Sequence, residues 1–552
     1  MEVMSMYTMI KSNKIIRTIG LAAVSLLLLG GCDMDRYPLT SFSEETFYHD
    51  EANVKLALNG LYRGGITLGV DYNVSDWWAY SATILLDGIS DIGYDRRGFN
   101  NAIGQLTAGT ITETNLWVTN LYQKPYKRIS ACCRFIDGLE ALTNESAEME
   151  RMKAEARFIR AVQYFYLASF YHDVPLVTKT MTLEEANSVT KSARAEVLKY
   201  AADELKAVSE ILPRHKDLPS SEQGRATAQA ALVYLARTYL VMEDFTNAAA
   251  ACEQIISWGD NALDSNYQTL FYQSGEGSSE HIFATQFVDD LAGIGLPQHA
   301  YPIKDGGWCL VNISNFLFEA YDFLDGTPFS YEDARFNKTN FGANRDPRLD
   351  YTLYYEGATF RGSVYRCNPE STTADKIGPG QTTQTGYLLR KFLDESWSGD
   401  VNSYGVNVPL ARYADVLLMY LEAKVRGGEA ITQQLLDQTI NAVRGRQSVG
   451  MPALTETNPD KLFKLIQKER MVELAFEGWR LWDLFRWGIA EEKLNADIYG
   501  SPFYVSDQSL MKMKDGQPDP HNRWYVNTRS FQKGQDIWPI PLAEKNINPN
   551  LR

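Results

Sequence analysis

The chain has 552 residues, of which 69 are acidic and 54 basic, so its formal net charge is −15. Apolar residues make up 45% and charged residues 22%, which is typical of a globular protein and excludes wholesale disorder or a fibrous repeat. The acidic balance disfavours a nucleic-acid-binding protein, because such proteins need a basic face that displaces counterions.

Residues 1–31 have the pattern of a lipoprotein signal peptide. Three basic side chains lie in Lys11–Arg17, and the apolar run Leu21–Leu29 follows. This run is too short to cross a bilayer, which takes about 20 residues, but it fits the apolar part of a signal peptide. Two glycines then precede Cys32, as in a bacterial lipobox, which predicts cleavage before Cys32 and its lipidation. An ordinary secretory signal that happens to contain a cysteine is the alternative.

From about residue 40 to residue 260 the apolar residues recur at helical spacing. The segment Gly224–Trp258 resembles one tetratricopeptide-type (TPR) helical hairpin, in which small Ala236 and Ala248 let two antiparallel helices approach closely. The other helices expected here are Asn115–Leu139, Ala154–Tyr171 and Ser192–Leu212.

From Ser274 to about Asn407, Gly, Ser, Thr, Asn, Asp and aromatic residues dominate, and alternating apolar runs are short. This texture predicts loops with a few short strands, and long structured loops are where binding residues usually lie. Helices are expected again at Tyr413–Arg426, Thr432–Arg444 and Pro459–Arg486. The predicted fold is therefore mostly α, with a TPR-like helical-pair scaffold up to about residue 260 and a loop-rich region with short strands from about residue 274 to residue 552.

Motifs of catalysis are absent from the sequence. No phosphate-binding loop, zinc-protease HExxH or nucleophile-elbow GxSxG pattern occurs. Asp289 and Asp290 could supply half of the carboxylate pair that glycoside hydrolysis needs, but adjacent acids are expected by chance in so acidic a chain. Asp322 and Asp325 resemble part of a calcium loop whose remaining ligands are missing. We therefore predict no catalytic residue, no metal ligand and no cofactor, and leave a structural calcium ion open.

Removal of the lipobox cysteine leaves an odd number of cysteines, with no spacing typical of metal ligands. We expect buried free thiols rather than disulfides. The residues concerned are Cys132, Cys133, Cys252, Cys309 and Cys367.

Several motifs together resemble the SusD/RagB family. The most extended is Gln467–Gly488, with the sequence QKERMVELAFEGWRLWDLFRWG, and shorter matches are Asn344–Leu349, Arg412–Leu418, Pro539–Pro541 and Asn548–Leu551. Further matches at Trp117–Ile129, Ala156–Tyr171 and Asp173–Pro175 extend the resemblance over essentially the whole mature chain. The resemblance implies one SusD-like domain over residues 32–552. It also implies a non-enzymatic surface lipoprotein of Bacteroidetes, anchored in the outer membrane, which captures oligosaccharides or sometimes peptides and forms a lid over a SusC-like TonB-dependent transporter.

The charged residues of the motif are expected to be structural rather than ligand-binding. Glu473, Glu477 and Arg480 have i, i+4 and i+3 spacings suited to ion pairs along one helix. With Asp483 and Arg486 they predict a charge network that would be costly to break on one side only.

In a sugar-binding site, an aromatic ring covers the C–H face of a sugar and polar side chains bind its hydroxyl groups. The family resemblance directs attention to two loops, Ile92–Asn101 and Tyr301–Trp308. The predicted ligand-binding residues are Trp308, Tyr301, Tyr94, Arg96, Asn100 and, although a core position is favoured for it, Trp78.

Three functions compete at this point. The first is a glycan-capture lipoprotein that works with a transporter, and the second is a peptide-binding lid of the same architecture. The third, a surface glycoside hydrolase, would need two carboxylates roughly 5 to 10 Å apart in a cleft.

Overall fold

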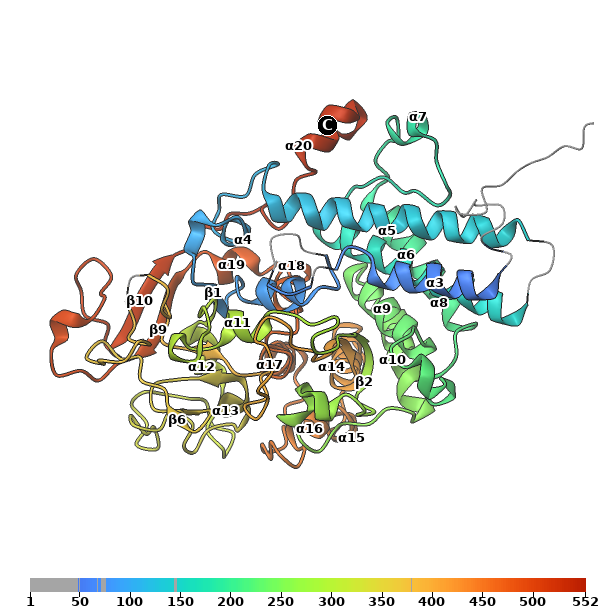
Figure 1. Ribbon diagram of the computed structural model, residues 1–552. Coiled ribbons are helices and arrows are strands. Elements are labelled where there is room, and N and C mark those ends of the chain that lie inside the picture. The colour runs from blue at the N-terminus through green and yellow to red at the C-terminus, as the bar shows by residue number, and fades with distance from the viewer. Residues whose placement is uncertain (1–47, 49, 67, 71–75, 143–145, 379) are drawn as a thin grey trace, which may run out of the picture. The chain divides into compact units, whose positions relative to one another are not determined.

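The computed structural model describes residues 48, 50–66, 68–70, 76–142, 146–378 and 380–552 (Figure 1). The predicted signal peptide and Cys32 lie outside these residues. The chain divides into two units, 1–54 and 55–552, and the account below concerns the second. Among the described residues, no helix is both long and apolar enough to cross a membrane.

The N-terminal half of the chain forms paired antiparallel helices. Along the chain, α5 packs on α6, α6 on α8, α8 on α9, α9 on α10, α10 on α14 and α14 on α17. The helices up to residue 258 are α3 (Glu51–Arg63), α4 (Ala102–Gln105), α5 (Leu116–Glu140), α6 (Ala147–Phe170), α7 (Leu183–Ala186), α8 (Arg194–Ser209), α9 (Ala228–Val241) and α10 (Phe245–Trp258). The predicted helical scaffold is confirmed.

Helices α9 and α10 form the predicted TPR-like hairpin. The Thr227 side chain accepts a hydrogen bond from the Ala230 amide and so caps the start of α9. Helix α10 ends at Gly259, whose φ of 66° is readily adopted by glycine. Ala236 and Ala248 are both fully buried and α9 packs on α10, as expected for a hairpin whose helices approach closely.

The second half consists of loops, short strands and further helices, as predicted. Its helices are α11 (Leu296–Ala300), α12 (Asn315–Ala320), α13 (Arg348–Thr352), α14 (Tyr413–Arg426), α15 (Gln433–Gln438), α16 (Ile440–Arg444), α17 (Pro459–Glu473), α18 (Arg480–Arg486), α19 (Ala490–Leu494) and α20 (Leu542–Ile547). Strand β1 (Gly93–Asp95) comes from the N-terminal half. The strands of the second half are β2 (His281–Thr285), β3 (Val311–Ile313), β4 (Leu353–Tyr354), β5 (Thr359–Phe360), β6 (Ser363–Val364), β7 (Leu388–Leu389), β8 (Val408–Arg412), β9 (Asp497–Pro502) and β10 (Arg523–Thr528). One antiparallel sheet has the order β1-β3-β7-β4, and β2–β8, β5–β6 and β9–β10 form two-stranded sheets.

Two predicted helices are interrupted. The segment Thr432–Arg444 splits into α15 and α16 at Thr439, whose φ of −124° and ψ of −100° are not helical. The segment Pro459–Arg486 splits into α17 and α18, because Phe476 and Gly478 both adopt positive φ. The expectation of one continuous helix was therefore wrong, and with it the expectation that Glu473, Glu477 and Arg480 pair along one helix face.

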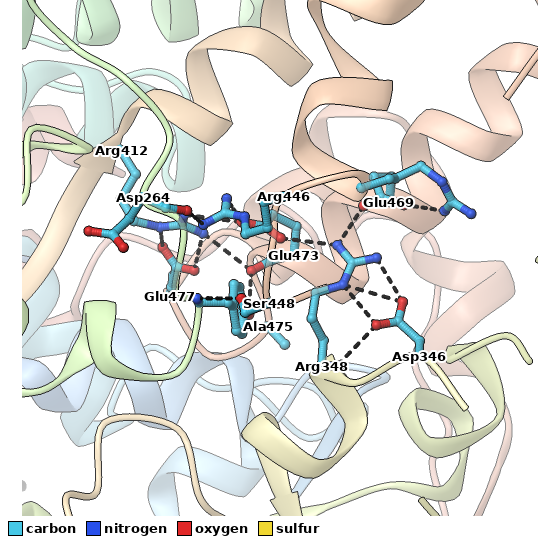
Figure 2. Close-up of polar contacts among 12 residues, drawn as sticks. Asp264, Asp346, Arg348, Arg412, Arg446, Ser448, Glu469, Glu473, Ala475 and Glu477 are labelled. Atoms are coloured by element: carbon cyan, nitrogen blue, oxygen red, sulfur yellow. Dashed lines mark hydrogen bonds and ion pairs between the residues drawn. The ribbon is translucent and has the colours of Figure 1, made fainter. Parts of the chain in front are cut away.

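A buried ion-pair network surrounds the C-terminal end of α17 instead (Figure 2). Glu473 is fully buried and lies 2.8 Å from Arg446, 3.0 Å from Arg348 and 3.2 Å from Arg412. Glu477 binds Arg412 at 2.7 Å. The partners Arg348, Arg412 and Arg446 come from separate segments of the chain, so the network joins the loop-rich region to α17.

The remaining motif charges are also paired and buried. Asp483 lies 2.9 Å from Arg470 and 2.7 Å from Arg486, and Arg480 lies 2.6 Å from Asp91. The prediction that these residues have a structural role in a charge network is confirmed.

Because of this network, the free energy of unfolding decreases at acid pH. Burial alone raises the pKa of Asp415, but the guanidinium groups of Arg470 and Arg237 lower it to about 2. Burial likewise raises the pKa of Glu473, and three arginines with Lys391 lower it to about 2. Both values lie below those of an unfolded chain, which are about 3.9 for Asp and 4.3 for Glu. The stabilisation is therefore fully present above about pH 5 and is lost as the pH falls toward 2.

We expect the free energy of unfolding, measured by urea titration, to fall by about 2 kcal/mol or more between pH 5 and pH 2.5. The variant Glu473→Gln lacks one of these carboxyl groups and should show a shallower fall over the same range. An equal fall in the free energy of unfolding for both proteins over this pH range would contradict the assignment of this pH dependence to Glu473.

Residues close to the C-terminus complete the core of the N-terminal half. Trp538 is 1% exposed, stacks near Trp77 with ring centroids 6.0 Å apart, and packs against Phe170 at 4.8 Å. Its amide donates a hydrogen bond of 2.7 Å to the carbonyl oxygen of Phe170. Segments more than 350 residues apart in the sequence thus share one aromatic cluster.

The five described cysteines are free and buried, as predicted.

Candidate functional site

The sheet brings the two predicted ligand loops side by side. Strand β1 at the start of the first loop pairs with β3 just after the second, so that Tyr94 lies opposite Asn312. The Arg96 amide extends this pairing with a hydrogen bond of 3.1 Å to the carbonyl oxygen of Leu310. We call residues 94–100 and 301–308 the two-loop cluster.

Trp308 is the half-buried aromatic residue of the second loop, and its position is fixed from both sides. Its amide donates a 2.7 Å hydrogen bond to the carbonyl oxygen of Gln298, and its ring lies 5.4 Å from the His299 ring. The preceding residue must be glycine, since a Cβ atom at Gly307 would lie 2.0 Å from the carbonyl oxygen of Tyr301. The backbone therefore holds the indole with part of its surface open to solvent.

The His299 ring packs against the Trp308 ring and is fully buried. Its Nδ1 atom is 3.0 Å from the Tyr80 hydroxyl group. Burial, with a smaller contribution from the Arg97 charge, lowers the pKa of His299 to about 3. The ring is thus neutral at physiological pH and presents an uncharged surface to Trp308.

Tyr301 has a supporting position in the same loop. Its ring is 1% exposed, packs edge-on against Phe360 at 5.0 Å, and lies 5.6 Å from the Arg361 guanidinium group. Its predicted ligand contact stays a prediction, because in this conformation the ring has almost no free surface.

In the first loop, the three predicted residues differ in exposure. Tyr94 is 6% exposed, and its hydroxyl group accepts a 3.3 Å hydrogen bond from Asn527. Arg96 is half-buried and donates a 3.3 Å hydrogen bond to the carbonyl oxygen of Gly380, whereas Asn100 is exposed. Of the three predicted residues, Arg96 and Asn100 therefore keep side-chain surface that is accessible to solvent.

Trp78 is not part of the two-loop cluster. It is 2% exposed, packs edge-on against Phe283 at 5.4 Å, and its ring is 4.6 Å from the Arg128 guanidinium group. These contacts place it in the core, as favoured from the sequence, and its alternative role in binding stays a prediction.

Two cationic residues near the cluster were not singled out as ligand residues. Lys304 is exposed and donates a hydrogen bond to the Ser363 hydroxyl group in β6, and exposed Arg361 lies in the turn between β5 and β6. Lys304 belongs to the second loop, but no pattern in the sequence indicated that the β5–β6 hairpin comes so close to it.

The carboxylates considered for catalysis or calcium have structural partners. Asp289 accepts hydrogen bonds from Gly405, Gln273 and Trp397 at 2.6, 2.9 and 3.4 Å. Asp322 lies 2.5 Å from Lys468, and Asp325 lies 2.5 Å from Arg335. Across the described ranges, no group of three or more His, Cys, Asp or Glu side chains is arranged to hold a metal ion.

Comparison with known proteins relates this architecture to one family. The sequence model described as "SusD family" matches residues 265–552, and one described as "Starch-binding associating with outer membrane" matches residues 97–240. A crystal structure of a SusD-like carbohydrate binding protein from Bacteroides fragilis superposes with a TM-score of 0.89 at 47% identity, covering 92% of this chain and 100% of that one.

Two relatives with lower sequence identity also carry SusD or SusD-like descriptions. SusD-like protein P2 of Formosa agariphila is 24% identical over 86% of this chain and 91% of its own length. The starch-binding protein SusD of Bacteroides thetaiotaomicron is 21% identical over 82% of this chain and 81% of its own length. The match over more than half of the chain, together with the near-complete structural likeness, shows that this protein belongs to the SusD family.

Proposed function

We propose that this chain is a surface glycan-binding lipoprotein and that the two-loop cluster contacts the sugar. The observation that carries this proposal is Trp308, whose half-buried indole lies in one loop while the pairing of β1 with β3 brings the loop of Arg96 and Asn100 to it. An aromatic face with polar groups at its edge suits a sugar ring, which has apolar C–H faces and a rim of hydroxyl groups. The relative at 47% identity is described as carbohydrate binding, which supports the same class of ligand.

The proposal includes the cellular setting. Lipidation of Cys32 would anchor the protein in the outer membrane, and the captured oligosaccharide would pass to a SusC-like TonB-dependent transporter. Family membership and the lipobox-like sequence support both points. The protein would bind and deliver its ligand without chemical change, since Asp289 serves the structure and catalytic motifs are absent from the sequence.

The test is isothermal titration of the lipid-free protein, lacking residues 1–32, against a panel of plant, host and microbial glycans. One glycan class should bind, and Trp308→Ala should weaken that binding by about tenfold or more, because stacking on an aromatic ring contributes roughly 1.5 kcal/mol. Trp258→Ala is the matched control, since Trp258 is also a half-buried tryptophan but ends α10 in the helical scaffold.

Other outcomes favour other functions. Retention of peptides in native mass spectra, without binding of any glycan, would favour the peptide-binding lid. Release of shorter products from oligosaccharides would establish a hydrolase and overturn the proposal. Copurification of a barrel protein from outer membranes would support the transporter as partner, and its absence under mild detergent would count against this part.

A further inference from the structure

A groove outside the two-loop cluster is lined by residues of α12, α17, α19 and the β9–β10 hairpin. It consists of two adjoining hollows of about 270 and 610 Å³. The hollows share Phe316, Glu319, Glu492 and Lys493, so that they form one continuous depression. No residue that lines them belongs to either loop of the cluster.

The groove is cationic although the chain is acidic. Six basic and four acidic side chains line the two hollows, whereas acids outnumber bases over the chain as a whole. The basic residues are Lys464, Lys468, Arg480, Lys493, Arg523 and Arg529, and the acidic residues are Asp91, Glu319, Glu492 and Asp497. Four of these bases already have carboxylate partners: Lys468 pairs with Asp322, Arg480 with Asp91, Lys493 with Glu492, and Arg523 with Glu319 and Asp519. The charges of the other two, Arg529 and Lys464, favour an anionic ligand.

Arg529 is the most informative of the basic residues. It is 3% exposed, and its guanidinium group donates to the carbonyl oxygens of Ser90 and Gly93 at 2.7 and 2.8 Å. Within the described part of the chain its Nε atom has no hydrogen-bond partner, and the carboxylate that acts on its charge, Asp91, is already paired with Arg480 at 2.6 Å. Burial lowers the pKa of Arg529 to about 10, and the charge of Asp91 opposes this shift only in part. A buried guanidinium that shares its carboxylate with a second arginine at the edge of a hollow is stabilised by an anion bound there.

At the other end of the groove, Lys464 is exposed on α17 and makes no ion pair among the residues described. Lys468, one turn further on, is already held by Asp322 at 2.5 Å. Lys464 is therefore available to a ligand without loss of an existing ion pair.

Apolar surfaces accompany the charges. Phe316 is 41% exposed where the two hollows meet, and Tyr499 lies beside it under the Arg523 guanidinium group at 4.5 Å. Met471 and Ile489 line the larger hollow. A simple anion would make no use of these surfaces, whereas a sugar would cover Phe316 with its C–H face.

We propose that this groove binds an anionic oligosaccharide, with one charged sugar unit near Arg529 and further units running past Phe316 toward Lys464. The proposal rests on the proposed glycan-binding function and specifies an acidic class of ligand at a second site. Carboxylate and sulfate groups both match the fork of an arginine side chain.

The test compares three probes by isothermal titration of the lipid-free protein: a tetrasaccharide of uronic acids, the same compound with its carboxyl groups reduced to alcohols, and a sulfated tetrasaccharide. We expect at least one anionic probe to bind about tenfold more tightly than the reduced probe, with affinity falling as salt rises. Phe316→Ala should weaken this binding by about tenfold, and Lys464→Gln by about threefold.

The controls are Tyr504→Ala, which removes an aromatic ring with a similar exposed fraction of 39%, and Lys461→Gln, which removes an exposed lysine of the same helix that does not line the groove. Neither control should change affinity. Trp308→Ala should leave the anion-dependent binding intact, so that failure of the two sites can be told apart.

Equal affinity for the reduced and anionic probes would overturn the proposal, as would binding that Phe316→Ala and Lys464→Gln leave unchanged. Competition by a short poly-glutamate peptide at equal potency would show that the groove recognises charge alone, and would also overturn it.

Discussion

Replacement of Glu473 by glutamine should lower the free energy of unfolding by about 3–5 kcal/mol. Glu473 is the shared carboxylate of Arg348, Arg412 and Arg446 in a region without solvent. Glutamine has nearly the same shape, so packing is preserved while three buried guanidinium groups lose a common counter-charge. Breaking one side of a buried ion pair is strongly destabilising, because the remaining charge stays desolvated.

Urea-induced unfolding followed by tryptophan fluorescence measures this loss. Glu140→Gln is the matched control, since Glu140 is exposed at the end of α5 and the same change there should alter the free energy of unfolding by less than about 0.5 kcal/mol. A loss below about 1 kcal/mol for Glu473→Gln would show that the arginines find compensation elsewhere.

Gly478→Ala should destabilise the protein by roughly 2–4 kcal/mol. Gly478 lies in the break between α17 and α18 with φ at 84°, where an alanine is strained. A Cβ atom there would also lie 2.8 Å from the Cα atom of Thr83, which is backbone and has little freedom to move away. The substitution therefore combines backbone strain with displacement of a neighbouring segment.

Gly516→Ala separates the two contributions. Gly516 has a similar φ of 71°, but a Cβ atom there would meet no other atom within 4 Å. This variant should lose only the strain, about 1 kcal/mol. Thermal and urea unfolding of both variants measure the difference, and equal losses would show that the contact with Thr83 has no effect.

The spacing of apolar residues along the sequence predicted helices well where one apolar face packs against one neighbouring element. Helix α14 begins at Tyr413 and ends at Arg426 as expected, and Ala236 and Ala248 correctly indicated the close hairpin. These features depend on residues three or four positions apart, which the sequence displays directly.

The break after α17 could not be predicted in the same way. Around Phe476 and Gly478 the apolar spacing continues as in a helix. The turn is held by Asp87, which is nearly 400 residues away in sequence and accepts hydrogen bonds from the amides of Gly478 and Arg480 at 2.9 and 3.0 Å. Likewise, Glu473 and Glu477 were rightly expected to be structural, but their partners come from distant segments that no local spacing indicates.

The candidate site, too, was predictable from the sequence only in part. The aromatic and glycine residues around Trp308 indicated a loop suited to sugars, and pairing of β1 with β3 brings the first loop to it. The burial of Tyr301 and the approach of the β5–β6 hairpin depend on tertiary packing, which the sequence does not display. The cationic groove was missed altogether. Lys468, Met471 and Arg480 lie in the Gln467–Gly488 motif, but the other residues that line the groove come from distant elements that no local pattern connects with it.

The position of Trp538 has a consequence for the order of events as the protein is made. The ribosome releases a chain from its N-terminus, so Trp77 and Phe170 emerge hundreds of residues before the side chain that covers them. Until residue 538 is available the N-terminal helices keep an uncovered aromatic surface, and partly folded intermediates with exposed apolar surface are prone to aggregate. Removal of residues 538–552 should therefore impair accumulation of the protein far more than loss of an equally long surface loop.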